Sequence, residues 1–317
     1  MKIGIIGIGT IGKGVLELLN KEKENIEKRI GETIEISWIC DLNENINNIE
    51  NYNFTKDYKK VLEDSSVETI IELIGGNSIA FEIAKETLKN KKNLITANKY
   101  LLATKGKEIF ELAKKNKVKI FFEGAIAGGT PIVSSIYEGI FSGGIKQIRG
   151  ILNGTSNYIL SKMEEGYSFK DALTIAQKEG YAELDSTFDI KGIDTAHKIS
   201  LLSYLIWDEF IDFEKIVVKG IDHITDKDIE IAKSSGKRYK LIGEASKENE
   251  LIKIVVKPVL IDKNDPLYNV NDAYNGIESY GHYLEKTFFC GKGAGALPTA
   301  TSIIGDLYKI RNSNAWY

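Results

Sequence analysis

A lysine and an aspartate four residues apart are the first candidates for chemistry in this chain. Asp194 and Lys198 lie in the segment 193–207, where about 3.6 residues make one helical turn, so both side chains project from one stripe of a helix. The other faces are mostly apolar, which predicts a buried helix. Because burying an unpaired charge is costly, the two groups form either a paired structural bridge or a functional site that faces a cleft.

Carboxylates crowd the segment just upstream. Glu183, Asp185 and Asp189 fall within the range 183–189. Such a segment can bind an ammonium group, coordinate a hard cation or cap the next helix, and capping stays an alternative for Asp189 and Asp194. No pair of the three histidines has the spacing of metal ligands on one element.

The first residues carry the glycine pattern of a dinucleotide-binding turn. Gly7, Gly9 and Gly12 lie between an apolar strand predicted at 2–6 and a helical pattern. The first glycine permits a tight turn, the second lets the backbone approach a pyrophosphate, and the third lets the helix pack on the strand. The N-terminus of the helix then binds the negatively charged pyrophosphate, so the pattern predicts dinucleotide binding.

Asp41, at the end of a strand predicted at 34–40, is the candidate that binds the adenosine ribose. Its distance from Gly12 exceeds the usual spacing of about 20 residues, which requires a lengthened helix and loop. The alternative is an aspartate in an ordinary turn. A carboxylate would repel a 2′-phosphate, and no arginine occurs between Arg29 and Arg149, so NAD is predicted in preference to NADP. Three lysines could still reach such a phosphate: Lys56, Lys59 and Lys60.

Strands and helices alternate through the first part of the chain, which predicts an α/β fold with a parallel sheet. The further strands are expected at 68–74, 93–96 and 117–122, with helices at 80–89 and 105–116 among those between them. The asparagine-rich tract 43–53 is expected to be a loop. After about residue 130 a long helix from 193 precedes strands, which indicates an α+β second domain. These strands are predicted at 216–221, 240–245 and 251–260, and a closing helix at 299–310.

Composition restricts the class of protein. The chain has 317 residues, 42 Lys plus Arg against 45 Asp plus Glu, and a formal charge of -3, which suits about two globular domains. This balance argues against nucleic acid and membrane surfaces as partners and favours a small-molecule substrate. Two cysteines, Cys40 and Cys290, cannot build a disulfide framework, and no stretch reaches the roughly 18 apolar residues of a membrane helix. A cytoplasmic location is therefore expected.

Seven segments resemble the homoserine dehydrogenase family, in the family's order and over nearly the whole chain. They are GIGTIGKGV, IELIGG, ITANK, EGAIAGGTPIV, GILNGTSNYILSKM, YAELDSTFDIKGIDTAHK and GKGAGALPTA. The fifth and sixth segments are highly specific, because ordinary Rossmann dehydrogenases do not carry them. The resemblance implies a Rossmann-type dinucleotide-binding domain, residues 1–130 completed by 291–317. It also implies an α+β substrate and dimerisation domain, residues 131–290.

The implied activity is the reversible reduction of L-aspartate 4-semialdehyde to L-homoserine with NAD(P)H. Lys198 would be the proton donor and acceptor at the substrate oxygen, and Lys99 the second catalytic lysine. Glu183, Asp189 and Asp194 would hold the substrate. With the residues inferred above, the implied cofactor-binding set is Gly7, Gly9, Thr10, Ile11, Gly12, Asp41, Gly75, Thr96, Lys99, Gly180 and Gly295.

The resemblance also implies a monovalent cation, expected to be sodium, and a homodimer. The cation ligands would be the backbone carbonyl groups of Glu123, Ile126, Gly128 and Thr130. The segment after Pro131 and the closing helix are the candidates for the dimer interface. The C-terminal regulatory domain of longer relatives is expected to be missing.

Three positions depart from the family's pattern: Leu184, Cys40 and Thr130, where relatives commonly have Ile or Leu and the carbonyl ligand does not depend on the side chain. Leu184 stands where relatives usually have proline, which removes a restraint on φ near Glu183. Cys40 stands where many relatives have arginine, which supports a preference for NAD as the cofactor.

Two rival functions remain. A semialdehyde dehydrogenase needs a cysteine nucleophile, and a nucleotide sensor without chemistry has no use for two lysines. Because lysine is already protonated near neutrality, aldehyde reduction should run there and homoserine oxidation should improve at alkaline pH.

Overall fold

The computed structural model describes residues 1–46, 49 and 51–313, so part of the tract predicted as a loop at 43–53 lies outside the described residues. The chain divides into two compact units. The first comprises Met1–Gly129 and Gly295–Tyr317, and the second Thr130–Ala294. The first unit resumes at Gly295 rather than at 291, because Glu285–Lys292 pairs as a strand within the sheet of the second unit.

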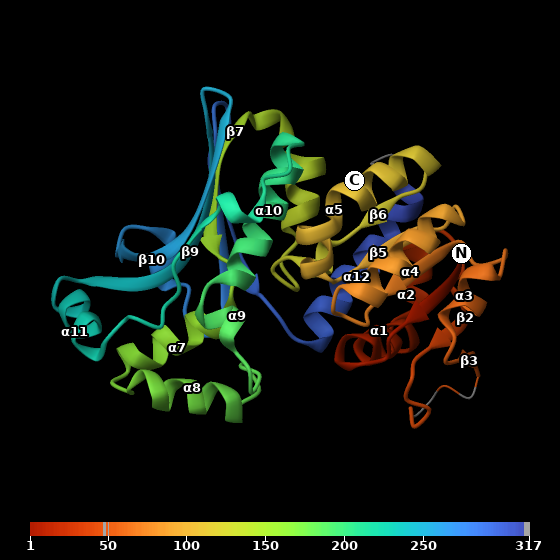
Figure 1. The fold of residues 1–317 in the computed structure, drawn as a ribbon, viewed down its shortest axis with the longest axis horizontal. Coiled ribbons are helices and arrows are strands. Elements are labelled where there is room, and N and C mark those ends of the chain that lie inside the picture. The colour runs from red at the N-terminus through yellow and green to blue at the C-terminus, as the bar shows by residue number, and fades with distance from the viewer. Residues whose placement is uncertain (47–48, 50, 314–317) are drawn as a thin grey trace. The chain divides into compact units, whose positions relative to one another are not determined.

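Six parallel strands form the sheet of the first unit, in the order β3-β2-β1-β4-β5-β6 (Figure 1). They are β1 (Lys2–Ile6), β2 (Glu35–Cys40), β3 (Asn53–Thr55), β4 (Thr69–Glu72), β5 (Asn93–Thr96) and β6 (Ile120–Phe121). Burial of their isoleucines, of which Ile3, Ile5 and Ile70 are fully buried, stabilises the sheet. The strand order reverses between β1 and β4, and ligands of doubly wound sheets bind beyond the strand ends at such a point.

Helices cover this sheet and close the unit. They are α1 (Thr10–Lys21), α2 (Lys23–Ile30), α3 (Tyr58–Glu63), α4 (Ser78–Lys89), α5 (Lys99–Asn116), the short η1 (Glu123–Ala125) and α12 (Ala296–Asn312). Helix α12 packs closely on α1, since a Cβ atom at Gly14 would lie 2.8 Å from the carbonyl oxygen of Ala296.

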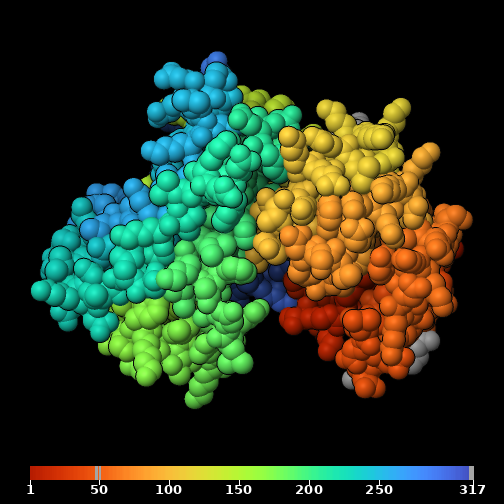
Figure 2. Space-filling view, viewed as in Figure 1, coloured from red at the N-terminus to blue at the C-terminus, as the bar shows by residue number. Residues whose placement is uncertain are grey.

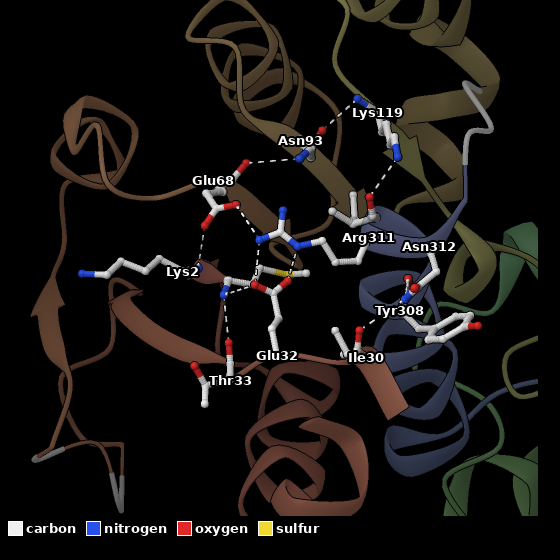
Figure 3. Close-up of polar contacts among 12 residues, drawn as sticks. Lys2, Ile30, Glu32, Thr33, Glu68, Asn93, Lys119, Tyr308, Arg311 and Asn312 are labelled. Carbon is white, nitrogen blue, oxygen red and sulfur yellow. Dashed lines mark hydrogen bonds and ion pairs between the residues drawn. The ribbon is translucent and has the colours of Figure 1, made fainter. Parts of the chain in front are cut away.

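Charged side chains attach the end of α12 to the rest of the first unit (Figure 3). Arg311 pairs with Glu32, and this interaction lowers the pKa of Glu32 to about 2. Lys119 Nζ donates to the carbonyl oxygens of Ile310, at 2.9 Å, and Ser313, at 2.5 Å, so a cation occupies the negative end of the helix dipole. These contacts fix the C-terminal helix on a sheet whose strands come from the first 121 residues.

The second unit contains a mixed six-stranded sheet in the order β12-β11-β7-β9-β10-β8. Its strands are β7 (Ile145–Ile151), β8 (Val217–Val218), β9 (Lys237–Glu248), β10 (Leu251–Asp262), β11 (Tyr274–Gly281) and β12 (Glu285–Lys292). Its helices are α6 (Ile132–Ser134), α7 (Gly154–Glu164), α8 (Phe169–Lys178), α9 (Thr187–Ile190), α10 (Ile193–Trp207) and α11 (Asp226–Ser234). Single-turn helical segments are η2 (Ser135–Ile140), η3 (Phe141–Gly143), η4 (Phe213–Lys215) and η5 (Pro266–Asn269).

Helix α10 occupies the predicted range 193–207 and is buried along its first three turns. It packs on β9, where Gly243 leaves room for Thr195 and Ile199. Helix α8 lies at the surface of the unit, as the yellow-green segment of Figure 2 shows. The fold is therefore the predicted one, a Rossmann-type unit followed by an α+β unit. Among the described residues no helix combines the length and apolarity that crossing a membrane requires.

A lysine is buried beneath α7 in the second unit. The side chain of Lys240, on β9, is fully buried and donates to Asn157 Oδ1 at 3.2 Å, Val270 O at 2.7 Å and Asn271 Oδ1 at 3.1 Å. Burial lowers the pKa of Lys240 to about 8, against the attraction of Glu164. The protonated form is therefore less stable in the folded chain than in water.

This burial predicts a rise in stability at alkaline pH. Between pH 8 and 10.5 the unfolded chain binds more protons at Lys240 than the folded chain, so the free energy of unfolding increases with pH. The full difference amounts to about 3 kcal/mol. Urea unfolding at pH 8 and pH 10.5 should therefore show a change in the free energy of unfolding that is more positive for the wild type than for Lys240→Met, in which the other titrating groups are the same. Equal changes in the two proteins would contradict the prediction.

Candidate active site

The glycine turn after β1 has the geometry that a dinucleotide requires. Gly7 has a φ of +99°, and a Cβ atom there would lie 2.7 Å from the backbone carbon of Leu73. A Cβ atom at Gly12 would lie 2.3 Å from the carbonyl oxygen of Gly7, whereas one at Gly9 would meet no atom within 4 Å. Two glycines thus allow close packing and the middle one faces open space.

Helix α1 begins directly at this turn. Gly9 is its N-cap, and no side chain caps the helix start, while Thr10 and Ile11 form its first turn. The first N–H groups of an uncapped helix carry partial positive charge and bind anions. The predicted pyrophosphate residues therefore lie together at the point where the strand order reverses.

Asp41 lies beside the glycine turn, directly after β2. Its Oδ2 accepts the backbone N–H of Ile8 at 2.6 Å, and its Oδ1 accepts that of Asn43 at 2.8 Å. The carboxylate therefore stabilises the turn as well as lying where a ribose is expected. The two interpretations of Asp41, turn residue and ribose ligand, are compatible, because each carboxylate oxygen has a second lone pair.

The ends of β4 and β5 are joined by a buried glutamate, Glu72, which was not among the site residues predicted from the sequence. Glu72 accepts the hydroxyl of Thr96 at 2.7 Å and the N–H of Ile74 at 2.9 Å, and burial raises its pKa. Asn98 caps α5 and donates to the carbonyl oxygen of Gly76 at 2.7 Å. These bonds fix the turn that contains Gly75, and they fix the start of α5.

Lys99 is the first residue of α5 and is half-buried. It follows Thr96 and Asn98, whose hydrogen bonds hold this strand-to-helix turn. Because the carboxyl ends of parallel strands meet at one sheet edge, Gly7, Gly75, Thr96 and Lys99 lie on the same edge of the first unit.

In the second unit, Asp194 and Lys198 form a buried ion pair on α10. Lys198 Nζ lies 2.8 Å from Asp194 Oδ2 and donates to the carbonyl oxygen of Leu152 at 2.7 Å. Lys198 is 8% exposed and Asp194 is 5% exposed. The lysine is thus held by its own helix and by the turn between β7 and α7.

Asn153 connects this pair to Asp189 and was not among the residues predicted from the sequence. Its Nδ2 donates to Asp189 Oδ1 at 2.6 Å and to Asp194 Oδ2 at 2.8 Å. Neither α9 nor α10 has a side-chain cap, so the capping alternative for Asp189 and Asp194 does not describe their contacts. The motif GILNGTS contained the signal, since an Asn before a helix start is a common N-cap.

The remaining predicted substrate and cofactor residues of this unit lie in the exposed segment between α8 and α9. Gly180 has a φ of +79° and follows α8, and Glu183 is exposed. Leu184 is 95% exposed, at the position where the proline was expected. Asp185 accepts the N–H of Thr187 at 3.1 Å, so this third carboxylate makes a local turn bond just before α9. Glu183 therefore lies outside the hydrogen-bonded set around Asn153.

The segment 123–128 is held by α12 within the first unit. Asp306 accepts the N–H of Glu123 at 2.9 Å, and Lys309 pairs with the Glu123 carboxylate at 3.0 Å and with Asp306 at 2.7 Å. Burial raises the pKa of Asp306. Ser302 donates to the carbonyl oxygen of Gly128 at 2.6 Å. The carbonyl groups of Glu123, Ile126 and Gly128, three of the four expected cation ligands, thus belong to a segment that α12 holds.

Cysteine chemistry and side-chain metal sites find no support. Burial raises the pKa of Cys40 to about 11 and raises that of Cys290, so neither thiol is activated. Within residues 1–46, 49 and 51–313 no group of His, Cys, Asp and Glu side chains could hold a metal ion.

A glycine turn at the reversal point of a parallel sheet, together with a buried lysine on a second unit, defines a class: nicotinamide nucleotide-dependent oxidoreductases. Two family profiles match the chain. One, described as homoserine dehydrogenase, matches residues 131–308, and the other, described as homoserine dehydrogenase, NAD binding domain, matches residues 7–123.

Known proteins are similar over almost the whole chain. A homoserine dehydrogenase of Neisseria gonorrhoeae is 41% identical over 313 residues, covering 98% of this chain and 72% of that protein. The structure of a homoserine dehydrogenase from Thiobacillus denitrificans has a TM-score of 0.94 at 37% identity, covering 98% of this chain and 73% of that one. A hyperthermophilic archaeal homoserine dehydrogenase mutant in complex with NADPH has a TM-score of 0.82 at 26% identity, covering 98% and 97%. The chain belongs to the homoserine dehydrogenase family.

Proposed function

We propose that this protein catalyses the reversible, NAD(P)H-dependent reduction of L-aspartate 4-semialdehyde to L-homoserine. The observation that carries this proposal is the buried pair of Lys198 and Asp194 in a chain that also has the glycine turn of a dinucleotide-binding unit. A protein that only senses nucleotides needs the turn but has no use for the two lysines Lys99 and Lys198.

The chemistry needs one hydride and one proton. Bound nicotinamide supplies the hydride to the aldehyde carbon, so the residues of the chain have to orient the substrate and transfer the proton. In reduction, protonated Lys198 gives its proton to the aldehyde oxygen; in oxidation, the neutral amine removes the hydroxyl proton. Asp194 keeps the lysine oriented and stabilises its charged form. Lys99 is the second catalytic lysine, and Glu183, Asp189 and Asp194 hold the substrate.

For the cofactor we propose NAD in preference to NADP. Asp41 presents a carboxylate beside the glycine turn, where it would repel a 2′-phosphate, and the neighbouring Cys40 side chain is buried and uncharged. Steady-state oxidation of homoserine should give a kcat/KM about tenfold or more higher with NAD than with NADP. A preference for NADP would contradict this assignment, and binding of either nucleotide without turnover would favour the sensor.

We also propose that the carbonyl oxygens of Glu123, Ile126, Gly128 and Thr130 hold a sodium ion. Hard cations prefer such oxygens, and a carbonyl oxygen has two lone pairs, so the hydrogen bonds that Gly128 and Thr130 accept are compatible with a bound ion. Because a bound ion stabilises the folded chain, the melting temperature should rise with sodium chloride more than with choline chloride at equal ionic strength. Equal rises with the two salts would argue against this site.

A homodimer is part of the proposal. One face of the β9–β10 hairpin is hollowed, with a cavity of about 660 Å³ lined by residues that include Ile242, Val255 and Val259. Besides the segment after Pro131 and the closing helix, this face is a candidate interface, where a second copy would remove apolar surface from water. Sedimentation equilibrium should then give twice the 35.4 kDa mass of one chain.

A further inference from the structure

We infer that Asn153 is a positioning residue for proton transfer, which acts on Lys198 through Asp194. This inference rests on the proposed function. It assigns to the asparagine two separable tasks: capping α7 and holding the carboxylates that orient the lysine.

The oxygen and both hydrogens of the Asn153 amide are engaged. Oδ1 accepts the N–H of Ser156 at 2.7 Å, which caps α7. Nδ2 has two hydrogens and donates to Asp189 Oδ1 at 2.6 Å and Asp194 Oδ2 at 2.8 Å. Asn153 is only 4% exposed, so water would not readily replace these bonds.

The geometry joins this amide to the lysine at a single atom. Asp194 Oδ2 receives both Asn153 Nδ2 and Lys198 Nζ, each at 2.8 Å. Leu152, the residue next to Asn153, supplies a further acceptor of Lys198, its carbonyl oxygen at 2.7 Å. The turn from β7 to α7 therefore orients the ammonium group twice, once by its backbone and once through the carboxylate.

The neutral amide also keeps two carboxylates close together. An NH₂ group donates one hydrogen to Asp189 and one to Asp194, which a third carboxylate could not do. Aspartate at this position preserves the size of the side chain and the cap, but it replaces a donor by an acceptor. Serine preserves the cap and is too short to reach both carboxylates. Each variant thus removes the positioning task and leaves the capping task.

The test compares Asn153→Ala, Asn153→Ser and Asn153→Asp with wild type, using kcat, the KM for NAD and the melting temperature. The matched control is Ser168→Ala, which removes the cap of α8 in the same unit. We expect the serine variant to melt within a few degrees of wild type and the aspartate variant to melt lower, because it buries a third carboxylate beside two others. Both should lose about a hundredfold in kcat. Their KM for NAD should be unchanged. Ser168→Ala should lose melting temperature and keep its kcat.

A purely structural role gives a different pattern. In that case serine and aspartate would restore kcat, and only alanine would impair it, through the lost cap. A kcat within threefold of wild type in Asn153→Ser overturns the inference, and this variant alone decides the matter when Asn153→Asp does not fold. Absence of turnover in the wild type would instead contradict the proposed function, so the two failures are distinguishable.

Discussion

Replacement of Lys198 by alanine should lower kcat for homoserine oxidation and aldehyde reduction by about a thousandfold or more, because general acid–base catalysis is worth 10²–10⁴-fold. The dissociation constant for NADH should stay near that of the wild type, because the glycine turn lies in the first unit. Steady-state assays in both directions, with fluorescence titration of NADH, measure the two quantities.

The control is Lys162→Ala. Lys162 pairs with Glu165 on a helix of the same unit, at 2.9 Å, but this pair is at the surface. The two substitutions remove the same charge from an ion pair between residues three or four positions apart, and only the buried one should abolish turnover. Retention of a tenth or more of the wild-type kcat in Lys198→Ala would exclude this lysine as the proton donor.

The second large effect is expected at the glycine turn. In Gly12→Ala the new Cβ atom would lie 2.3 Å from the carbonyl oxygen of Gly7, so the helix and strand have to separate. We expect a lower melting temperature and a loss of NADH affinity of a hundredfold or more, because the pyrophosphate site consists of this backbone. Differential scanning calorimetry and NADH titration test both.

Two further glycines separate packing from binding. A Cβ atom at Gly9 meets nothing within 4 Å, so Gly9→Ala should keep the melting temperature and weaken NADH binding, because the methyl group occupies the approach of the pyrophosphate. Gly305 lies within α12, where alanine also meets no atom. Gly305→Ala should leave affinity unchanged and raise stability by about 1 kcal/mol. Wild-type affinity in Gly12→Ala would contradict the assigned role of the turn.

Local patterns predicted the elements that are apolar and continuous. Strand β1 and helix α10 lie where they were expected, because their hydrophobic residues repeat without interruption. Strands β7 and β11 were missed, because each has a charged residue in its middle. Arg149 on β7 faces Glu278 on β11, and the two side chains pair at 2.8 Å, so the charges neutralise each other only once the sheet has formed.

The residues of the candidate site also differ in how far the sequence alone could predict them. The glycine turn and the pair on α10 could be predicted, since their spacing within one element determines what their side chains share. Spacing alone could not choose between a structural bridge and a functional site for Asp194 and Lys198. Asn153 could not be assigned from spacing, because its partners lie 36 and 41 residues away and meet it only in the folded unit.

Transfer of deuterium tests the central claim, hydride transfer between nicotinamide and the aldehyde carbon, most directly. The protein would be incubated with L-aspartate 4-semialdehyde and NADH that carries deuterium at the transferable position of C4. Mass spectrometry should find homoserine with one deuterium, bonded to the carbon that bears the new hydroxyl group. Homoserine without deuterium at this carbon, or consumption of neither reactant, would contradict the account.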